Sequence, residues 1–427
     1  MKGLIFTYAL TYGGVLVSLF RPFTGLLIYI CFSLIKPDVL WSYSVPAGNY
    51  SRTVFLGLFV GWMFARFGNW RFGRAAWSVA FLVFYVAWSA LSATQAADQA
   101  LAWSIVAETA KIAFPIVVAL TLIESIEQVT QIVWTMVISL GYLALEFNLS
   151  YYSGENRLVT QGFAGMEEKT VAIMMVIGAG LAFFLAMTST RMAAKLVAVG
   201  AAALMIHVPL FTFSRGGMLG LIAMMAMAFV LIPKRPIHFA FLIAVVAIGL
   251  RLAGPEVRAQ FFTSFADERD RDYSAQSRVE LWGQAWETIA SRPILGIGPR
   301  QWQRWSQVRY NWENPKEVHN TWLQSGAELG VPGVGALILF YVTTGLGMWR
   351  LIRAKTYGVV ETTYARMVLA TLAGFAVTSQ FITVYGLEAP YFTALVGAGL
   401  LKLTSQPAAV PQPVPSVLRT RSTLHGA

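Results

Sequence analysis

The chain has 427 residues, of which 56% are hydrophobic and only 12% are charged, and its formal net charge is +11. Soluble domains carry about 25% charged residues, so this composition indicates a polytopic membrane protein. The basic excess is expected to orient the chain and to contact anionic membrane lipids. No basic cluster lies on a soluble module, which argues against nucleic-acid binding. The single cysteine, Cys31, excludes disulfides within the chain and argues against a cysteine-based metal site.

Thirteen apolar runs predict an all-α polytopic membrane helix bundle of about 12–13 spans. The runs are 4–20, 22–35, 53–65, 75–93, 105–123, 129–147, 170–187, 192–213, 217–232, 237–254, 331–349, 366–386 and 390–403. The first run follows Lys2 like a signal peptide, but no small-residue cleavage site follows it, so it is interpreted as a retained span. The count falls to twelve if residues 4–35 form one broken element.

Basic residues cluster in four connecting loops, around Arg71, Arg191, Lys234 and Arg353. The positive-inside rule makes the side that they share cytoplasmic. The opposite, periplasmic side then receives one long loop, 255–318, which holds equal numbers of basic and acidic residues. With thirteen spans the N-terminus lies on the periplasmic side.

These patterns divide the chain into four parts. Residues 1–254 are the first part of the transmembrane bundle, and residues 255–318 are a partly helical periplasmic loop that carries catalytic elements. Residues 319–403 are the second part of the bundle. The proline-rich tail 404–427 is predicted to be disordered and cytoplasmic.

Arg215 lies between the runs 192–213 and 217–232 with almost no loop around it. A charge so close to hydrocarbon is costly and tends to face a cavity, so we interpret Arg215 as functional. The adjacent Gly216 and Gly217 are expected to permit close approach of a ligand to the backbone. His207, two turns earlier, is interpreted as a packed, hydrogen-bonded residue.

Glu108 and Lys111 lie three residues apart inside the fifth apolar run. We predict that these two side chains pair with each other. A role in a transport path is the alternative.

The long polar loop contains a predicted helix. Ser277 with Glu280 has the pattern of a capping box, which predicts a helix start there and a stop near Pro293. Arg278 would then lie in the first turn, where the helix dipole opposes a cation unless an anion is bound. The alternative, a solvated arginine paired with Glu280 or Asp272, is favoured on placement alone.

A glycine-rich turn, 296–298, follows and lacks the lysine of a phosphate-binding loop. Arg300 and Arg304 alternate with Trp302, and these three residues are candidates for substrate binding. The tryptophan could stack on a sugar ring or lie at the level of the lipid headgroups, and the headgroup interpretation is favoured.

His319 precedes a predicted helix that runs through Leu323 and ends at Gly330. A histidine at a membrane boundary is more often structural than catalytic. Because His319 closes the loop that carries Arg278, we interpret it as a candidate catalyst. Asn320 is the predicted N-cap of the helix and a further candidate for substrate binding.

These segments together resemble the O-antigen ligase and O-antigen polymerase superfamily. The motifs are Phe213-Ser214-Arg215-Gly216, Ser277-Arg278 to Trp282, Pro293-Ile294-Leu295-Gly296-Ile297-Gly298, His319-Asn320-Thr321-Trp322-Leu323 and Glu328-Leu329-Gly330. The opening segment 21–37 is similar to the exosortase-associated branch of O-glycosylation ligases. Residues 162–169 lack an asparagine that many relatives carry, so the acceptor stays open.

The resemblance implies a membrane glycosyltransferase of lipopolysaccharide biosynthesis. Such enzymes move a glycan from a polyprenyl-diphosphate carrier to a hydroxyl of a lipid or glycan acceptor on the periplasmic face. The resemblance assigns Arg215 and Arg278 to binding of the diphosphate and His319 to activation of the acceptor. A polymerase, whose acceptor is a second lipid-linked glycan, is the first alternative. A lipid-glycan flippase or exporter, with Glu108 and Lys111 lining a path, is the second.

The chemistry fits these side chains. Paired arginines neutralise charge on a diphosphate leaving group without a metal, and a neutral histidine can accept the proton of a hydroxyl. No cofactor is expected. Asp267, Asp270 and Asp272 are interleaved with arginines and are interpreted as a solvated run rather than as metal ligands.

Overall fold

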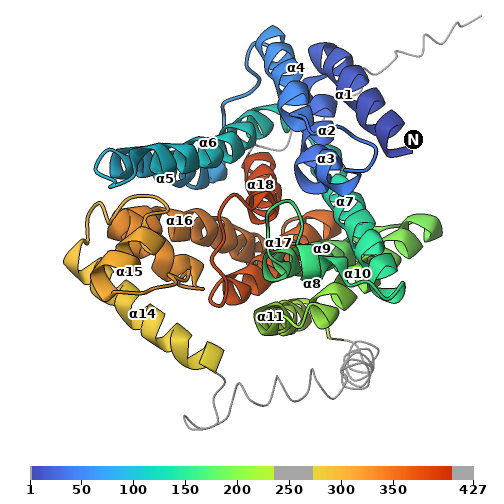
Figure 1. Cartoon of the computed structure of the whole chain (residues 1–427). Helices are drawn as coiled ribbons and strands as arrows, with labels where there is room; N and C mark the ends of the chain where they lie inside the picture. The colour runs from blue at the N-terminus through green and yellow to red at the C-terminus, as the bar shows by residue number, and fades with distance from the viewer. Residues whose placement is uncertain (1, 235–272, 406–427) are drawn as a thin grey trace, which may run out of the picture.

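The computed structural model describes residues 2–234 and 273–405, and all regular elements in these residues are helical (Figure 1). The helices are α1 (Lys2–Phe20), α2 (Pro22–Ile35), α3 (Pro37–Leu40), α4 (Tyr50–Phe64), α5 (Ala76–Ala93), α6 (Gln99–Leu122), α7 (Ile126–Tyr152), α8 (Arg157–Gln161), α9 (Glu168–Thr188), α10 (Met192–Phe211), α11 (Arg215–Leu231), α14 (Tyr273–Ser291), α15 (Trp302–Tyr310), α16 (Thr321–Ala354), α17 (Val359–Thr378) and α18 (Glu388–Leu403). The chain is therefore an all-α polytopic bundle.

Eight of the described helices are long and apolar enough to cross a membrane. Each predicted apolar run coincides with a helix, except that 237–254 lies outside the described residues and 366–386 is helical only as far as Thr378. α4 and α18, with 15 and 16 residues, are shorter than an average crossing of about 20. Arg21 separates α1 from α2, so residues 4–35 form two helices.

The basic loops meet at one end of the bundle. Arg74 donates from its side chain to the hydroxyl of Tyr357 and from its backbone N–H to Ser405 Oγ, each at 2.9 Å. Lys402 Nζ donates to the carbonyl oxygen of Asn69 at 3.1 Å. The loops around Arg71 and Arg353 therefore lie on the same side, as their charge predicts.

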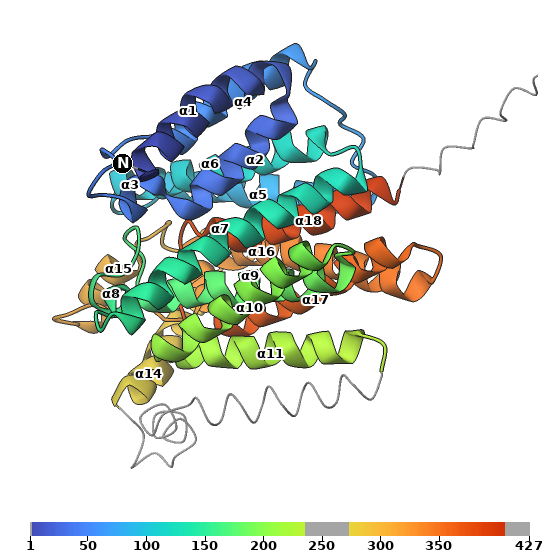
Figure 2. The same cartoon turned by 90° about the vertical axis from the view of Figure 1, so that its right-hand side faces the viewer.

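The opposite end carries α8, α14 and α15 (Figure 2). The helix α14 begins by Tyr273, so the predicted start at Ser277 is wrong. Ser277 and Glu280 are interior helix residues and do not form a capping box. Arg278 lies beyond the first turn, where the opposition of the helix dipole is weaker. The predicted stop is confirmed, because α14 ends at Ser291, just before Pro293.

A break in α16 receives the glycine-rich turn. Gly330 has φ 69° and ψ −179°, which ends the first part of α16 as the sequence predicts. A Cβ on Gly330 would overlap the carbonyl of Ile294, so only glycine fits. Val331 N–H donates to the carbonyl oxygen of Pro293 at 2.7 Å, and Ile297 N–H donates to that of Ala327 at 3.0 Å. The turn thus brings α14 against the start of α16.

Helices α11 and α17 cross closely and position the start of α11. A Cβ on Gly220 would lie 2.9 Å from the carbonyl oxygen of Gly374, and one on Gly374 would lie 3.0 Å from that of Gly220. Small residues at such a crossing let two helix backbones approach. The first turn of α11, which carries Arg215, consequently lies beside residues 379–382, which follow α17.

Candidate active site

A polar cavity of about 290 Å³ lies at the end of the bundle that carries α14. Its lining comes from the first turns of α9 and α11, from α14 and from the loop after α17. Its polar and charged lining residues are Glu168, Lys169, Thr212, Ser214, Arg215 and Arg278. Two helix N-termini contribute further positive potential, because their first amide groups lack partners within the helix. The cavity is therefore suited to an anion.

Arg215 and Arg278 both line this cavity, although they come from separate helices. Both side chains are partly exposed. Ser214 caps α11, since its Oγ accepts the N–H of Gly217 at 3.1 Å. Phe213 has φ 51°, a left-handed conformation that costs a bulky residue about 1–3 kcal/mol and persists only where surrounding contacts impose it. The backbone that presents Arg215 is thus held in one conformation.

Lys169 is a third cation at the cavity that the sequence did not reveal as a site residue. Its Nζ lies 3.9 Å from a carboxylate oxygen of Glu167 and 3.7 Å from one of Glu168. These separations leave the ammonium only loosely paired, and its side chain is 37% exposed. Lys169 lies in the first turn of α9, where a cation is opposed by the dipole, and this unfavourable placement was the available signal.

The two glycines after Arg215 have a different role from the predicted one. A Cβ on Gly216 would lie 2.9 Å from Cβ of Phe381, and one on Gly217 would lie 2.9 Å from Cβ of Ala172. They are needed for close packing of α11 against the loop after α17 and against α9. The expectation that both serve the approach of a ligand is wrong for Gly217, which is absent from the cavity lining.

His319 lies beside these cations, immediately before α16. Burial is the largest cause, and together with the positive charges of Arg278, Lys169 and Lys316 it lowers the pKa of the imidazole from 6.5 to about 4. The ring makes no hydrogen bond with the part of the chain that the structure describes. His319 is therefore neutral at neutral pH, and its ring nitrogen is available to accept a proton.

Asn320 and Thr321 attach the segment that carries His319 to the loop after α17 through hydrogen bonds. Asn320 is the N-cap of α16, as predicted, and its Oδ1 accepts the N–H groups of Trp322 and Leu323, both at 3.1 Å. Thr321 N–H donates to the carbonyl oxygen of Ser379 at 2.9 Å, and its Oγ1 donates to that of Ile382 at 2.7 Å. Asn320 is 3% exposed, so it positions the backbone and is not available to bind a substrate.

The remaining predicted binding residues lie away from the cavity lining. Trp302 is fully buried and its Nε1 donates to the carbonyl oxygen of Lys316 at 2.9 Å, so it can neither stack on a sugar nor lie among headgroups. The guanidinium of Arg300 lies 5.0 Å from the ring centre of Tyr385, and Arg304 is exposed on α15. Trp302 was misjudged because its burial depends on the packing of α15 against α14 and the start of α16, which no local pattern reveals.

Of the predictions for charged and polar residues elsewhere, one is confirmed and one is wrong. Glu108 and Lys111 form no ion pair in residues 2–234 and 273–405, so their predicted pairing is wrong. His207 is hydrogen bonded as predicted, with Nδ1 2.6 Å from Asn148 Oδ1. No group of three metal-ligating side chains occurs in the described residues. Asp267, Asp270 and Asp272 lie outside them, as do the tail residues 406–427.

Part of the chain is similar to a known protein family. Residues 200–341, about a third of the chain, match the family model described as O-antigen ligase. A search of curated proteins gave no match. The matched region contains Arg215, Arg278 and His319, whereas Lys169 lies before it. This match supports a relation of residues 200–341 to the O-antigen ligase superfamily.

Proposed function

We propose that the protein transfers a glycan from a polyprenyl-diphosphate carrier to an acceptor hydroxyl on the periplasmic face of the bacterial inner membrane. The family match supports a membrane glycosyltransferase of the O-antigen ligase or polymerase type. The observation that carries the donor assignment is the gathering of Arg215, Arg278 and Lys169 around one cavity. The exosortase-associated branch, which segment 21–37 resembles, stays a prediction.

The cavity lining suits the diphosphate of the donor. An arginine guanidinium presents several N–H donors in a planar fork that matches phosphate oxygens, and the helix N-termini add backbone dipoles. In the transfer step the bond between the sugar and the diphosphate breaks, and negative charge grows on the departing phosphate oxygen. Cations that are already in place stabilise this charge without rearrangement, so the proposed mechanism is metal-independent.

His319 is proposed to take the proton of the acceptor hydroxyl as that oxygen bonds to the sugar. Its low pKa keeps the imidazole neutral, which a base requires, but it also weakens the base. A diphosphate bound between Arg278 and Lys169 offsets their charges and raises the pKa of His319. The base therefore becomes stronger when the donor is present. Binding of the donor before deprotonation of the acceptor follows from this arrangement.

The test is transfer by the purified full-length protein in nanodiscs, supplied with a polyprenyl-diphosphate glycan. One arm contains a lipid acceptor and the other contains only further donor. Product on the lipid acceptor supports a ligase, and chain growth in the second arm supports a polymerase. Arg215→Ala should abolish either product, while Arg350→Ala, an exposed arginine at the other end of the bundle, should not. Movement of the donor across the bilayer without any transfer would overturn the proposal.

A further inference from the structure

The segment that carries His319 is bonded to its surroundings at successive residues. The carbonyl oxygen of Lys316 accepts from Trp302 Nε1 at 2.9 Å, and that of Val318 accepts from Trp282 Nε1 at 3.1 Å. The N–H of Val318 donates to Gln324 Oε1 at 2.9 Å. His319 itself has φ 54°, in the left-handed region that non-glycine residues seldom occupy. A conformation of this kind persists only where the surrounding structure imposes it.

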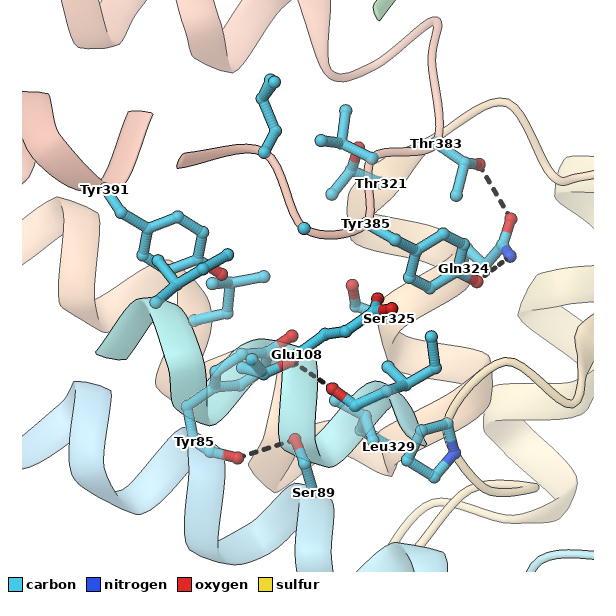
Figure 3. Close-up of a pocket in the computed structure, with 18 of the residues that line it drawn as sticks. Tyr85, Ser89, Glu108, Thr321, Gln324, Ser325, Leu329, Thr383, Tyr385 and Tyr391 are labelled. Carbon is cyan, nitrogen blue, oxygen red and sulfur yellow. Dashed lines mark hydrogen bonds between the residues drawn. The ribbon is translucent and has the colours of Figure 1, made fainter. Parts of the chain in front are cut away.

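The side chain of Gln324 is the centre of the hydrogen bonds that impose this backbone conformation on His319. The side chain is 1% exposed and lies between Thr383 and Tyr385 (Figure 3). Its Oε1 accepts from Val318 N–H and from Thr383 Oγ1, the latter at 2.8 Å. Its Nε2 donates to Tyr385 and to Glu317, the residue before Val318. One amide therefore joins the segment before His319 to the loop after α17.

Glu328, one turn further along α16, holds this amide in place. Its carboxylate belongs to a residue that is 3% exposed, and it accepts hydrogen bonds from three donors. Oε1 accepts the hydroxyl of Tyr385 at 2.6 Å and Nε2 of Gln324 at 3.2 Å, and Oε2 accepts the N–H of Arg300 at 2.9 Å. A buried polar network of this kind is rigid when all its members are satisfied.

We propose that Gln324, Glu328 and Tyr385 form a positioning unit that fixes the backbone of residues 316–319 and holds the imidazole of His319 beside Arg278. None of the three lines the cavity between Arg215 and Arg278, so none is a catalytic residue. They act through Val318. Its N–H donates to Gln324, and its carbonyl oxygen accepts from Trp282, which lies on the same helix as Arg278. The catalytic meaning of the unit rests on the proposed function, but the placement of His319 can be measured without any transfer.

Titration of His319 in the intact protein tests this placement. The full-length protein in nanodiscs, with ¹³C-labelled histidine, contains four histidines, and the His319 signal is the one lost in His319→Ala. In the unsubstituted protein the pKa of His319 should lie at about 4. Tyr385→Phe removes one oxygen and leaves the ring under Arg300, whereas Gln324→Leu removes the whole amide. In both variants the pKa should rise toward 6.5, because the freed imidazole becomes solvated and moves away from Arg278.

Tyr364→Phe is the matched control. Tyr364 is 1% exposed, and its hydroxyl donates one hydrogen bond, to Thr130 Oγ1 at 2.9 Å. It lies near the start of α17, at the other end of the bundle. This variant removes the same atom from a buried tyrosine far from His319, so it measures a general loss of stability. The pKa of His319 should stay at about 4.

Kinetics supply a second readout where transfer is observed. Displacement of a catalytic group by about 1 Å can cost roughly 100-fold in rate, so kcat should fall about 10-fold or more in Tyr385→Phe while KM for the donor stays nearly constant. An unchanged His319 titration in Tyr385→Phe overturns the proposal, even if Gln324→Leu fails to fold. An unsubstituted His319 that titrates near 6.5, or an equal change in Tyr364→Phe, overturns it as well. Absence of transfer in every assay would instead count against the proposed function and leave the titration to decide this inference.

Discussion

The indole nitrogen of Trp282 donates a hydrogen bond to the carbonyl oxygen of Val318 at 3.1 Å. Trp282 lies one turn after Arg278 on α14, and Val318 directly precedes His319. This bond joins the helix that carries a candidate diphosphate ligand to the segment that carries the candidate base. The guanidinium and the imidazole are thus held as a pair. A shift of α14 would disturb both donor binding and acceptor activation.

The first prediction concerns orientation in the membrane. On a Cys31→Ser background, Val308→Cys should react with an impermeant thiol reagent added from the periplasmic side, because Val308 is 80% exposed on α15. Arg71→Cys, Lys234→Cys and Lys355→Cys should react only from the cytoplasmic side, following loop charge. Trp302→Cys, at a buried position, is the unreactive control. Labelling of position 308 only from the cytoplasm would contradict the proposed periplasmic location of the site.

The second prediction concerns the donor cavity. Arg215→Ala and Arg278→Ala should each lower transfer about 100-fold or more, as loss of one transition-state donor typically does. Arg→Lys should rescue poorly at both positions, because an ammonium cannot bind a phosphate through two parallel hydrogen bonds. Lys169→Ala should have a smaller effect, since its ammonium is partly screened by Glu167 and Glu168.

Chelation tests whether transfer at this cavity needs a divalent metal ion. Transfer should continue in excess EDTA, with the initial rate measured before and after extensive dialysis. Arg350→Ala again supplies the control. Strict dependence on an added divalent ion would contradict the metal-independent mechanism.

The third prediction separates the chemical role of His319 from a structural one. His319→Ala and His319→Gln should retain binding of the lipid donor and lose nearly all transfer, because only the proton acceptor is removed. Donor retention is measured by co-purification in nanodiscs and transfer by product formation. Near-normal transfer by His319→Gln would show that hydrogen bonding suffices, and the catalytic role would be withdrawn.

The fourth prediction follows from the low pKa of His319. The free base is present above the folded pKa of about 4 and is lost as the pH falls through it, so kcat/KM should not vary with His319 protonation between pH 6 and 8. Pyrophosphate, used as a donor mimic, should raise this pKa by offsetting Arg278 and Lys169. Histidine NMR with and without pyrophosphate measures the change. A fall, or no change at saturating pyrophosphate, would contradict an anion site beside His319.

The fifth prediction concerns stability at the opposite end of the bundle. Lys402 is fully buried, and its Nζ donates to the carbonyl oxygens of Leu120, Asn69 and Thr121 at 2.5, 3.1 and 3.4 Å. Lys402→Met would leave these acceptors without a donor, at a cost of about 1–3 kcal/mol. The variant should lose folded protein at a lower temperature, as judged by size-exclusion chromatography after heating. Lys195→Met, at an exposed lysine, should not, and kcat per folded molecule should stay unchanged in both.

The helices could be predicted from the sequence because their signals are local, whereas the roles of Arg215, Arg278 and His319 stay predictions. Apolar runs of near-span length report helices directly, and an arginine squeezed between two such runs is conspicuous. The N-cap at Asn320 and the break at Gly330 also follow from local chemistry, and both are confirmed. Local chemistry therefore predicted both boundaries of the first part of α16.

The parts that were missed depend on packing between distant segments. Lys169 reaches the cavity because α9 packs beside α11, and Trp302 is buried because α15 folds back on α14. The start of α14 was misplaced because a Ser-x-x-Glu pattern also fits the interior of a helix. Gln324 was not singled out from the sequence, and Glu328 was noted only as part of a motif, because only their partners on other segments reveal their positions in the network.

The attachment of Thr321 to Ser379 and Ile382 has a consequence for biosynthesis. Phe381 and Ile382, which line the cavity, follow α17 and are therefore among the last parts of the bundle to leave the ribosome. A nascent chain that has inserted only its earlier helices has the arginines but lacks one wall of the cavity and the anchor of the histidine segment. If the protein has the proposed function, we expect a chain that ends before residue 379 to be inactive, so that carrier lipid is consumed only after α17 and the loop that follows it are in place.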